Sequence, residues 1–109
     1  MTENAARDLF PGALEMMILE SLRRQPAHGY ALVQHIQQRS KNLLQVEEGS
    51  LYPALQRLLL NGYVEAEWGT SENNRRARYY TLTADGRKQL SAERKEFDRM
   101  VLAIQKVLA

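Results

Sequence analysis

The 109-residue sequence contains no cysteine. Disulfide bonds, iron–sulfur clusters and thiolate-bound metals are therefore excluded, and nothing in the composition points to secretion. Long apolar runs are also lacking. No stretch approaches the roughly 18 apolar residues of a membrane-spanning helix, and no apolar segment follows a basic region at the N-terminus as in a signal peptide. We expect a cytoplasmic protein that has no contact with a membrane.

An excess of charge of one sign is lacking too. The 15 lysines and arginines face 13 acidic residues, which leaves a formal net charge of +2. Many proteins that never meet nucleic acid share this balance, so the distribution of charge is more informative than the sum. Its most informative part is a group of arginines within four positions: Arg75, Arg76 and Arg78. The length suffices for one domain with one core.

Patterns that indicate catalysis or a bound metal are absent from the sequence. There is no nucleophile–base spacing, glycine-rich phosphate loop or clustered carboxylate pair. The histidines, His28 and His35, are seven positions apart. That spacing spans about 10.5 Å along a helix axis, which is too far to share one ion. We expect no enzymatic activity, no cofactor and no metal, and we expect His28 to cap or pack at a helix start.

The apolar residues of the first half follow helical periods. One helix opens at residue 13 and ends at Pro26, and its stripe consists of Leu14, Met17, Ile18, Ser21 and Leu22. A second helix lies within residues 27–40. Its buried stripe consists of Leu32 and Ile36, which Val33 and Tyr30 can extend, although Tyr30 can equally face outward. Residues 41–46 form a connector that can include a short extended piece at residues 43–46.

Residues 48–62 predict a short third helix with two different faces. Its apolar face carries Leu51, Leu55, Leu58 and Leu59. The helix begins shortly before Pro53, with Glu48 or Ser50 as the cap, and a left-handed Gly62 closes it. The other face carries polar groups near the first turns: Ser50, Tyr52, Pro53, Gln56 and Arg57. This face suits the major groove of DNA, as in the second helix of a helix-turn-helix; an ordinary surface helix is the alternative.

After Gly62 the period changes to that of β-strands. Residues 63–68 alternate, with Val64, Ala66 and Trp68 on one side, and residues 77–83 form a return strand in which Tyr80 and Leu82 face one way. The polar tip between the strands, which includes Asn74, is rich in turn residues. The result is a hairpin, or wing, whose arginines can neutralise phosphates; a solvated run of charge is the alternative.

The final segment predicts one helix from about residue 84 to 108, roughly 37 Å long and capped by Thr83. Its apolar positions resemble a coiled-coil seam and include Leu90, Phe97, Met100, Val101, Ile104 and Leu108. So small a domain cannot bury this whole stripe, and a second copy of the chain is the simplest cover. We therefore expect a DNA-binding domain over residues 1–83 and a dimerisation helix over residues 84–109, within one compact unit.

Five short stretches match a known family at the right spacings. They are His28-Gly29-Tyr30, Gly49-Ser50-Leu51-Tyr52-Pro53-Ala54-Leu55 followed by Arg57-Leu58, Asn61-Gly62-Tyr63-Val64, Arg75-Arg76, and Tyr79-Tyr80-Thr81-Leu82-Thr83 with Gly86. With them the chain resembles the PadR family of bacterial transcriptional regulators over nearly its whole length. The single C-terminal helix is similar to the short subgroup of that family.

The resemblance implies an α+β, mostly α fold, a winged helix-turn-helix with a long C-terminal dimerisation helix. It also implies a homodimer that binds a palindromic operator on double-stranded DNA and commonly represses transcription. Some members release DNA when a small aromatic effector binds. Such members often carry a tryptophan in the last helix, where this chain has Phe97. The residues expected at DNA are Tyr30, Ser50, Tyr52, Pro53, Gln56, Arg57, Asn74, Arg75, Arg76 and Arg78.

A second class of function fits the same fold. A winged helix can serve as a protein–protein interaction module, in which the arginines would meet an acidic partner. The two readings differ in solution, because DNA binding through phosphates falls steeply with salt, by about 0.9 in log K per neutralised phosphate per decade. A protein module would bind DNA weakly and without regard to sequence.

Overall fold

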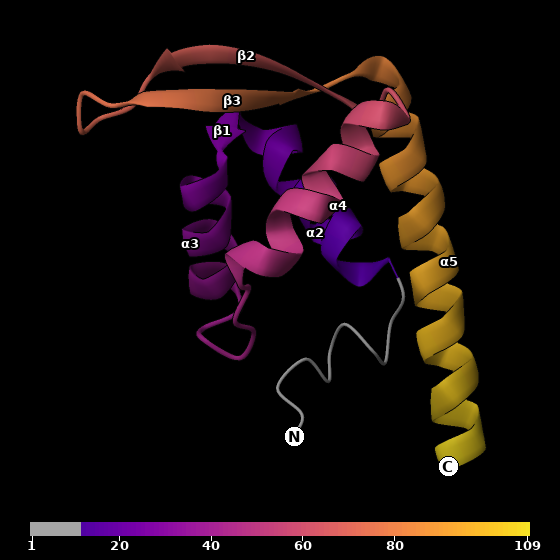
Figure 1. Cartoon of the computed structure of the whole chain (residues 1–109). Helices are drawn as coiled ribbons and strands as arrows, with labels where there is room; N and C mark the ends of the chain where they lie inside the picture. The colour runs from indigo at the N-terminus through magenta and orange to yellow at the C-terminus, as the bar shows by residue number, and fades with distance from the viewer. Residues whose placement is uncertain (1–11) are drawn as a thin grey trace.

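The structure, a computed structural model, describes residues 12–109, so the first 11 residues of the expected DNA-binding domain lie outside the described residues. The elements in chain order are α2 (Ala13–Arg24), β1 (Ala27–His28), α3 (Gly29–Arg39), α4 (Glu48–Leu60), β2 (Val64–Thr70), β3 (Arg76–Leu82) and α5 (Ala84–Leu108). Figure 1 shows α2, α3 and α4 packed together below a small sheet, with α5 running down one side. The expected α+β, mostly helical winged-helix architecture with a long C-terminal helix is confirmed.

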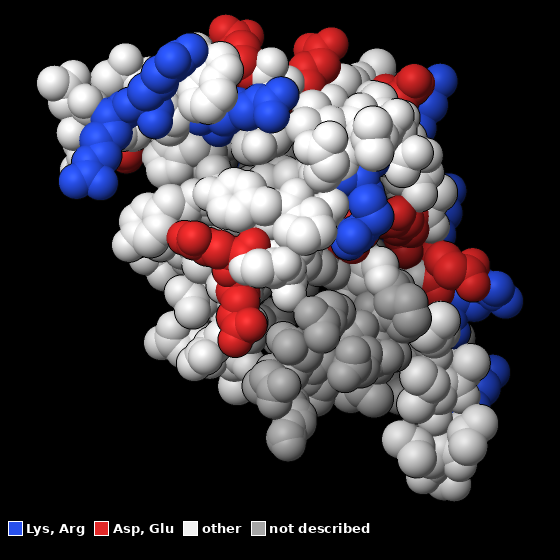
Figure 2. All heavy atoms as spheres, in the orientation of Figure 1, with Lys and Arg blue, Asp and Glu red and all other residues white. Residues whose placement is uncertain are grey.

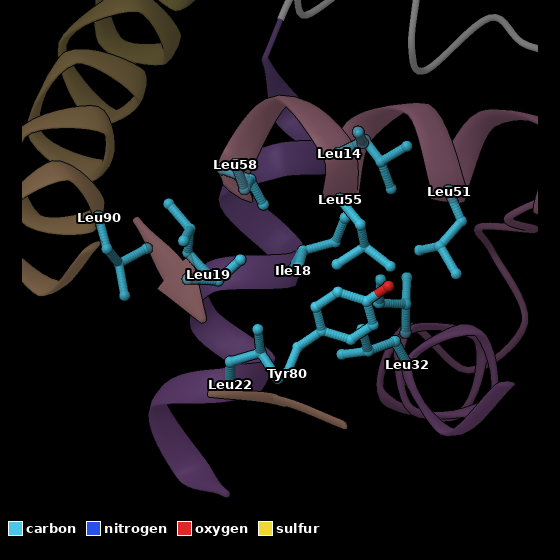
Figure 3. Packing of buried hydrophobic residues seen from close by; sticks show 13 residues of the cluster. Leu14, Ile18, Leu19, Leu22, Leu32, Leu51, Leu55, Leu58, Tyr80 and Leu90 are labelled. Carbon is cyan, nitrogen blue, oxygen red and sulfur yellow. The ribbon is translucent and has the colours of Figure 1, made fainter. Parts of the chain in front are cut away.

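The core is built around α2. Figure 3 shows side chains of α2 lying between those of α3, α4, β3 and α5. The predicted stripe of α4 is confirmed, since Leu51, Leu55 and Leu58 are buried and Leu59 packs against them. The stripe of α2 is broader than its period predicts, because Leu19 is fully buried while Met17 is only partly so. The reason is that α2 has neighbours on several sides and buries more than one face.

The start of the second helix differs from its prediction. Ala27 and His28 form the short strand β1, which pairs with Tyr80 and Tyr79 of β3. Two residues are too few to show a period, so no strand is predictable there. The expected capping role of His28 is confirmed, because its Nδ1 accepts a hydrogen bond from the backbone N–H of Ala31 at 3.2 Å.

Tyr30, for which packing in the stripe of the second helix and contact with DNA were both open, is not buried, because 56% of this residue is exposed. Tyr30 lies in the first turn of α3, on a side of the helix that faces solvent. Leu32 and Ile36, on the side that faces the core, are buried. In the connector that follows, Lys41 and Asn42 turn the chain with left-handed φ angles of 54° and 64°. The predicted extended piece at residues 43–46 is not part of a strand.

The helix α4 begins at Glu48, and its N-cap is Glu47, which makes no side-chain capping bond. The predicted caps Glu48 and Ser50 therefore lie within the first turn instead. Pro53 lies inside the helix, in its second turn. The predicted stop is confirmed, since Asn61 is the C-cap and Gly62 has a left-handed φ of 76°.

The sheet has the order β1-β3-β2 with antiparallel neighbours. Its register pairs Val64 with Leu82, Ala66 with Tyr80, and Trp68 with Arg78, so the predicted common side of the first strand is confirmed. Side chains of paired residues share a face, and near the core this face is buried. The hairpin then runs beyond the core, and Trp68 is 58% exposed.

The beginning of α5 is fixed by Thr83, whose predicted capping role is confirmed. Its Oγ1 accepts from the N–H of Gly86 at 3.0 Å and donates to the carbonyl of Gly62 at 2.7 Å. Leu90, which we expected in the dimer seam, is instead buried in the core of its own chain at 3% exposure. That expectation is wrong because the first two turns of α5 still lie against the domain. Farther along, Met100 and Ile104 are exposed.

Candidate nucleic-acid interface

A cleft of about 920 Å³ lies between the hairpin and the beginnings of α3 and α4. It collects side chains that are far apart in the sequence. Five of the residues expected at DNA line it: Tyr30, Tyr52, Arg75, Arg76 and Arg78. Its walls are therefore aromatic on the helical side and cationic on the hairpin side.

The hairpin supplies the positive charge. Figure 2 shows Lys and Arg side chains gathered over the hairpin at the upper left. Arg75, Arg76 and Arg78 are all exposed, and no carboxylate within residues 12–109 pairs with them. Asn74 has a left-handed φ of 59° and donates its N–H to the carbonyl of Ser71, so it shapes the turn. Three unpaired guanidinium groups on one hairpin can each neutralise a phosphate.

Tyr52 supplies the aromatic wall from α4. Its ring packs on the backbone of Gly29, where an added Cβ would stand 2.5 Å from the Tyr52 Oη. Burial raises the pKa of the Tyr52 hydroxyl above its ordinary value, and nearby Glu48 and Tyr80 act in the same direction. The hydroxyl therefore stays protonated and can donate a hydrogen bond to an acceptor on a ligand.

Three expected residues on α4, Ser50, Pro53 and Arg57, lie on its other flank. Arg57 directs both Nε and Nη2 to Oε2 of Glu15 in α2, each at 2.7 Å. Ser50 and Pro53 line a smaller hollow beside that ion pair. Gln56 is exposed but does not line the main cleft. The structure thus brings the tyrosines and wing arginines together and separates Arg57 from them.

Acidic groups border the same region. Glu47 and Glu48 are exposed at the start of α4, where Figure 2 shows acidic side chains below the hairpin. Glu72, in the hairpin tip, lies with Oε1 3.8 Å from Nε2 of His28. These carboxylates repel phosphate, so the favourable potential is concentrated at the arginine-bearing wing.

Comparison with known proteins identifies the family. Residues 18–92 match the Transcriptional regulator PadR-like family. The chain belongs to this family. This PadR-like chain is 32% identical over 90 residues to a protein of Lysinibacillus sphaericus described as "Uncharacterized protein X", and the match covers 83% of each sequence.

Solved structures agree with the assignment. A transcriptional regulator from Clostridium thermocellum superposes with a TM-score of 0.83 at 29% identity, covering 91% of this chain and 96% of the other. A PadR family transcriptional regulator from Eggerthella lenta gives a TM-score of 0.80 at 28% identity, covering 96% and 89%. Membership in the PadR-like family makes this chain a transcriptional regulator of a DNA-binding class.

Within residues 12–109, no helix combines the length and apolar character needed to cross a membrane. The same part of the chain has no group of three or more His, Asp or Glu residues that could hold a metal ion.

Trp68 is one of the cleft residues that the sequence analysis did not place at the site. It lines the cleft, and the guanidinium Cζ of Arg76 lies over its ring, 4.5 Å from the centroid. Strand alternation correctly groups Trp68 with the core-facing residues Val64 and Ala66, and so favours a buried position. The length of the hairpin could have indicated that Trp68 is exposed, because Trp68 is closer to the turn than any core residue of the strand.

Proposed function

We propose that this PadR-like regulator binds a palindromic operator as a homodimer and represses transcription there. The observation that carries the proposal is the convergence of the exposed wing arginines, the first turn of α3 and Tyr52 of α4 on one cleft. Wings and helix N-termini are the parts that winged-helix proteins present to a duplex. Since the target is chromosomal DNA, we propose that the protein acts in the cytoplasm.

The proposed contacts divide by chemistry. Arg75, Arg76 and Arg78 bind phosphates or reach the minor groove, while Tyr30 and Tyr52 donate to phosphate oxygens. Gln56 is exposed on α4 and can pair bidentately with adenine in the major groove. The remaining members of the proposed set are Ser50, Pro53, Asn74 and Arg57. Arg57 joins only by leaving Glu15, so it contributes less than its charge suggests.

The proposed dimer forms through the second half of α5. Its apolar stripe there consists of Phe97, Met100, Val101, Ile104 and Leu108. Met100, Ile104 and Leu108 are 42%, 41% and 78% exposed in the single chain. A stripe of this spacing is buried when a second helix packs along it. A two-fold axis through α5 would give two wings and two copies of α4, which is the symmetry that an inverted repeat requires.

In vitro selection of duplexes from a random pool at physiological salt tests the proposal. The expected result is enrichment of an inverted repeat, with half-sites about one helical turn or a multiple of it apart. Enrichment of no sequence would instead favour the protein-interaction module. A reporter placed downstream of the enriched site then measures whether the bound regulator lowers transcription.

A second observation favours an effector. A pocket of about 160 Å³ lies between the beginning of α2 and the middle of α5, lined by Met16, Phe97 and Met100 with Glu93 and Glu96. A cavity of about 150 Å³ holds one benzene ring. We propose that a single-ring aromatic effector binds there, uncharged or cationic because two carboxylates border the pocket. Thermal shifts with neutral, cationic and anionic single-ring compounds test it; stabilisation by anions alone would contradict it.

A further inference from the structure

We infer that Trp68 is a positioning residue for the DNA contact of Arg76. Its indole ring holds the guanidinium over the cleft before a duplex arrives. The inference rests on the proposed DNA-binding function and assigns a role to a side chain that this function leaves unexplained.

The hairpin register brings the two side chains to one face. Trp68 pairs directly with Arg78, so Arg76 is its diagonal neighbour on β3, two residues closer to the tip. Diagonal neighbours across a strand pair are within reach of aromatic and long side chains. The Cζ of Arg76 lies 4.5 Å from the centroid of the Trp68 ring, which is cation–π geometry.

Trp68 differs in exposure from the core residues on its face of β2. On the same face of β2, Val64 is 2% exposed and packs in the core, but Trp68 is 58% exposed. Because more than half of Trp68 is in solvent, its burial contributes less to folding than that of a core side chain. Both Trp68 and Arg76 line the cleft, which puts the stacked pair at the proposed interface with DNA.

Contacts on the opposite face of the hairpin hold the backbone next to Trp68 in place. Tyr79 packs over Gly69, where an added Cβ would lie 3.0 Å from the Tyr79 ring. The Tyr79 hydroxyl also donates to the carbonyl of Thr70 at 3.2 Å. These contacts fix the two residues of β2 that follow Trp68. A free arginine loses rotamer freedom when it binds phosphate, and a guanidinium already stacked on a fixed ring loses less.

Arg75 provides a matched control. It lines the same cleft and carries the same charge one position earlier, but it lies in the hairpin tip outside β3 and is not stacked on Trp68. If Trp68 acts through Arg76, its effect on DNA binding disappears when Arg76 is removed and persists when Arg75 is removed.

The test is a double-mutant cycle on a duplex enriched from a random pool. Trp68→Leu, which keeps an apolar side chain without a ring face, is expected to weaken binding about two- to five-fold. In the Arg76→Ala background the same change is expected to have no effect, and with Arg75→Ala it is expected to be additive. Trp68→Phe should restore most of the affinity. Additive effects of Trp68→Leu and Arg76→Ala would overturn the inference.

A readout without DNA keeps the inference testable if Trp68→Leu folds poorly. Trp68 is the sole tryptophan of the chain, so its fluorescence reports on its own surroundings. Arg76→Ala should change the emission of the free protein and Arg75→Ala should not; unchanged emission on removing Arg76 would overturn the stacking. If the wild-type chain shows no salt-dependent DNA binding, the proposed function is contradicted instead. Failure of the proposed function can thus be distinguished from failure of the role assigned to Trp68.

Discussion

Gly29, the first residue of α3, lies directly against the ring of Tyr52 in α4. A Cβ at Gly29 would stand 2.5 Å from the Tyr52 Oη and 2.9 Å from two ring carbons. The contact ties the start of one helix to the exposed face of the next. It therefore sets where Tyr52 enters the cleft.

Gly29→Ala is expected to displace Tyr52. The ring is 46% exposed and can swing toward solvent, so the cost in unfolding free energy stays on the order of 1 kcal/mol. DNA affinity should fall further than stability does. Titration of an operator duplex against Gly29→Ala, Tyr52→Ala and the double variant measures this. Fully additive losses would mean that Gly29 does not act through Tyr52.

Gly86→Ala is expected to be far more damaging to folding. An added Cβ at Gly86 would overlap the backbone carbonyl oxygen of Tyr63, which already accepts the N–H of Thr83. Backbone held in this way cannot yield easily, so we expect a loss of about 3 kcal/mol or more in urea unfolding. Gly49→Ala is the control, because nothing lies within 4 Å of its added Cβ and alanine favours the helix. Equal stability of the two variants would contradict the close approach.

Glu20 makes the stability of the domain depend on acid pH. The side-chain hydrogen bond from Arg23 lowers the pKa of Glu20 below its ordinary value of 4.5, against burial, and Arg94 and Arg24 add to the lowering. A lowered folded-state pKa stabilises the fold above the unfolded pKa, and this contribution is lost as pH falls through the folded pKa. Thermal melts from about pH 6 to about pH 3 should show a smaller loss for Glu20→Gln than for wild type. If the melting temperatures of the two proteins fall in parallel with pH, Glu20 does not contribute to the loss of stability in acid.

Ile104→Asp is expected to convert a dimer into a monomer. Ile104 is 41% exposed on the apolar stripe of α5, and a carboxylate there would be buried without a partner in the proposed dimer. Ala103→Asp introduces the same charge one position earlier, off the stripe. Sedimentation at micromolar concentration should find Ala103→Asp dimeric and Ile104→Asp monomeric. An Ile104→Asp chain that stays dimeric contradicts the proposed seam.

The periodic parts of the fold were predictable from the sequence. Repeated apolar spacing marks most of the side chains of α2 and α4 that reach the core, and Gly62 marks the end of α4. The strand β1 was not predictable, because its pairing with β3 depends on a partner about 50 residues away that no local pattern reveals. Leu90 follows the same stripe as Ile104, and only tertiary packing separates their surroundings.

The cleft could be predicted in composition but not in arrangement. Clustered arginines and a polar helix start are visible in the sequence. For this reason five of the cleft residues were expected near DNA: Tyr30, Tyr52, Arg75, Arg76 and Arg78. The pairing of Arg57 with Glu15 was hidden, since it joins positions 42 residues apart. The stacking of Arg76 on Trp68 depends on the hairpin register, which places two specific residues on one face beyond the core.

The salt dependence of DNA binding tests the central claim, that the wing meets phosphates in a two-fold complex. With a selected operator, log K should fall steeply and linearly with log salt for the wild-type dimer. Removing one phosphate contact per protomer with Arg76→Ala should shallow the slope by up to about 1.8 units per dimer. A wild-type slope near zero, or a slope that Arg76→Ala leaves unchanged, would contradict the account.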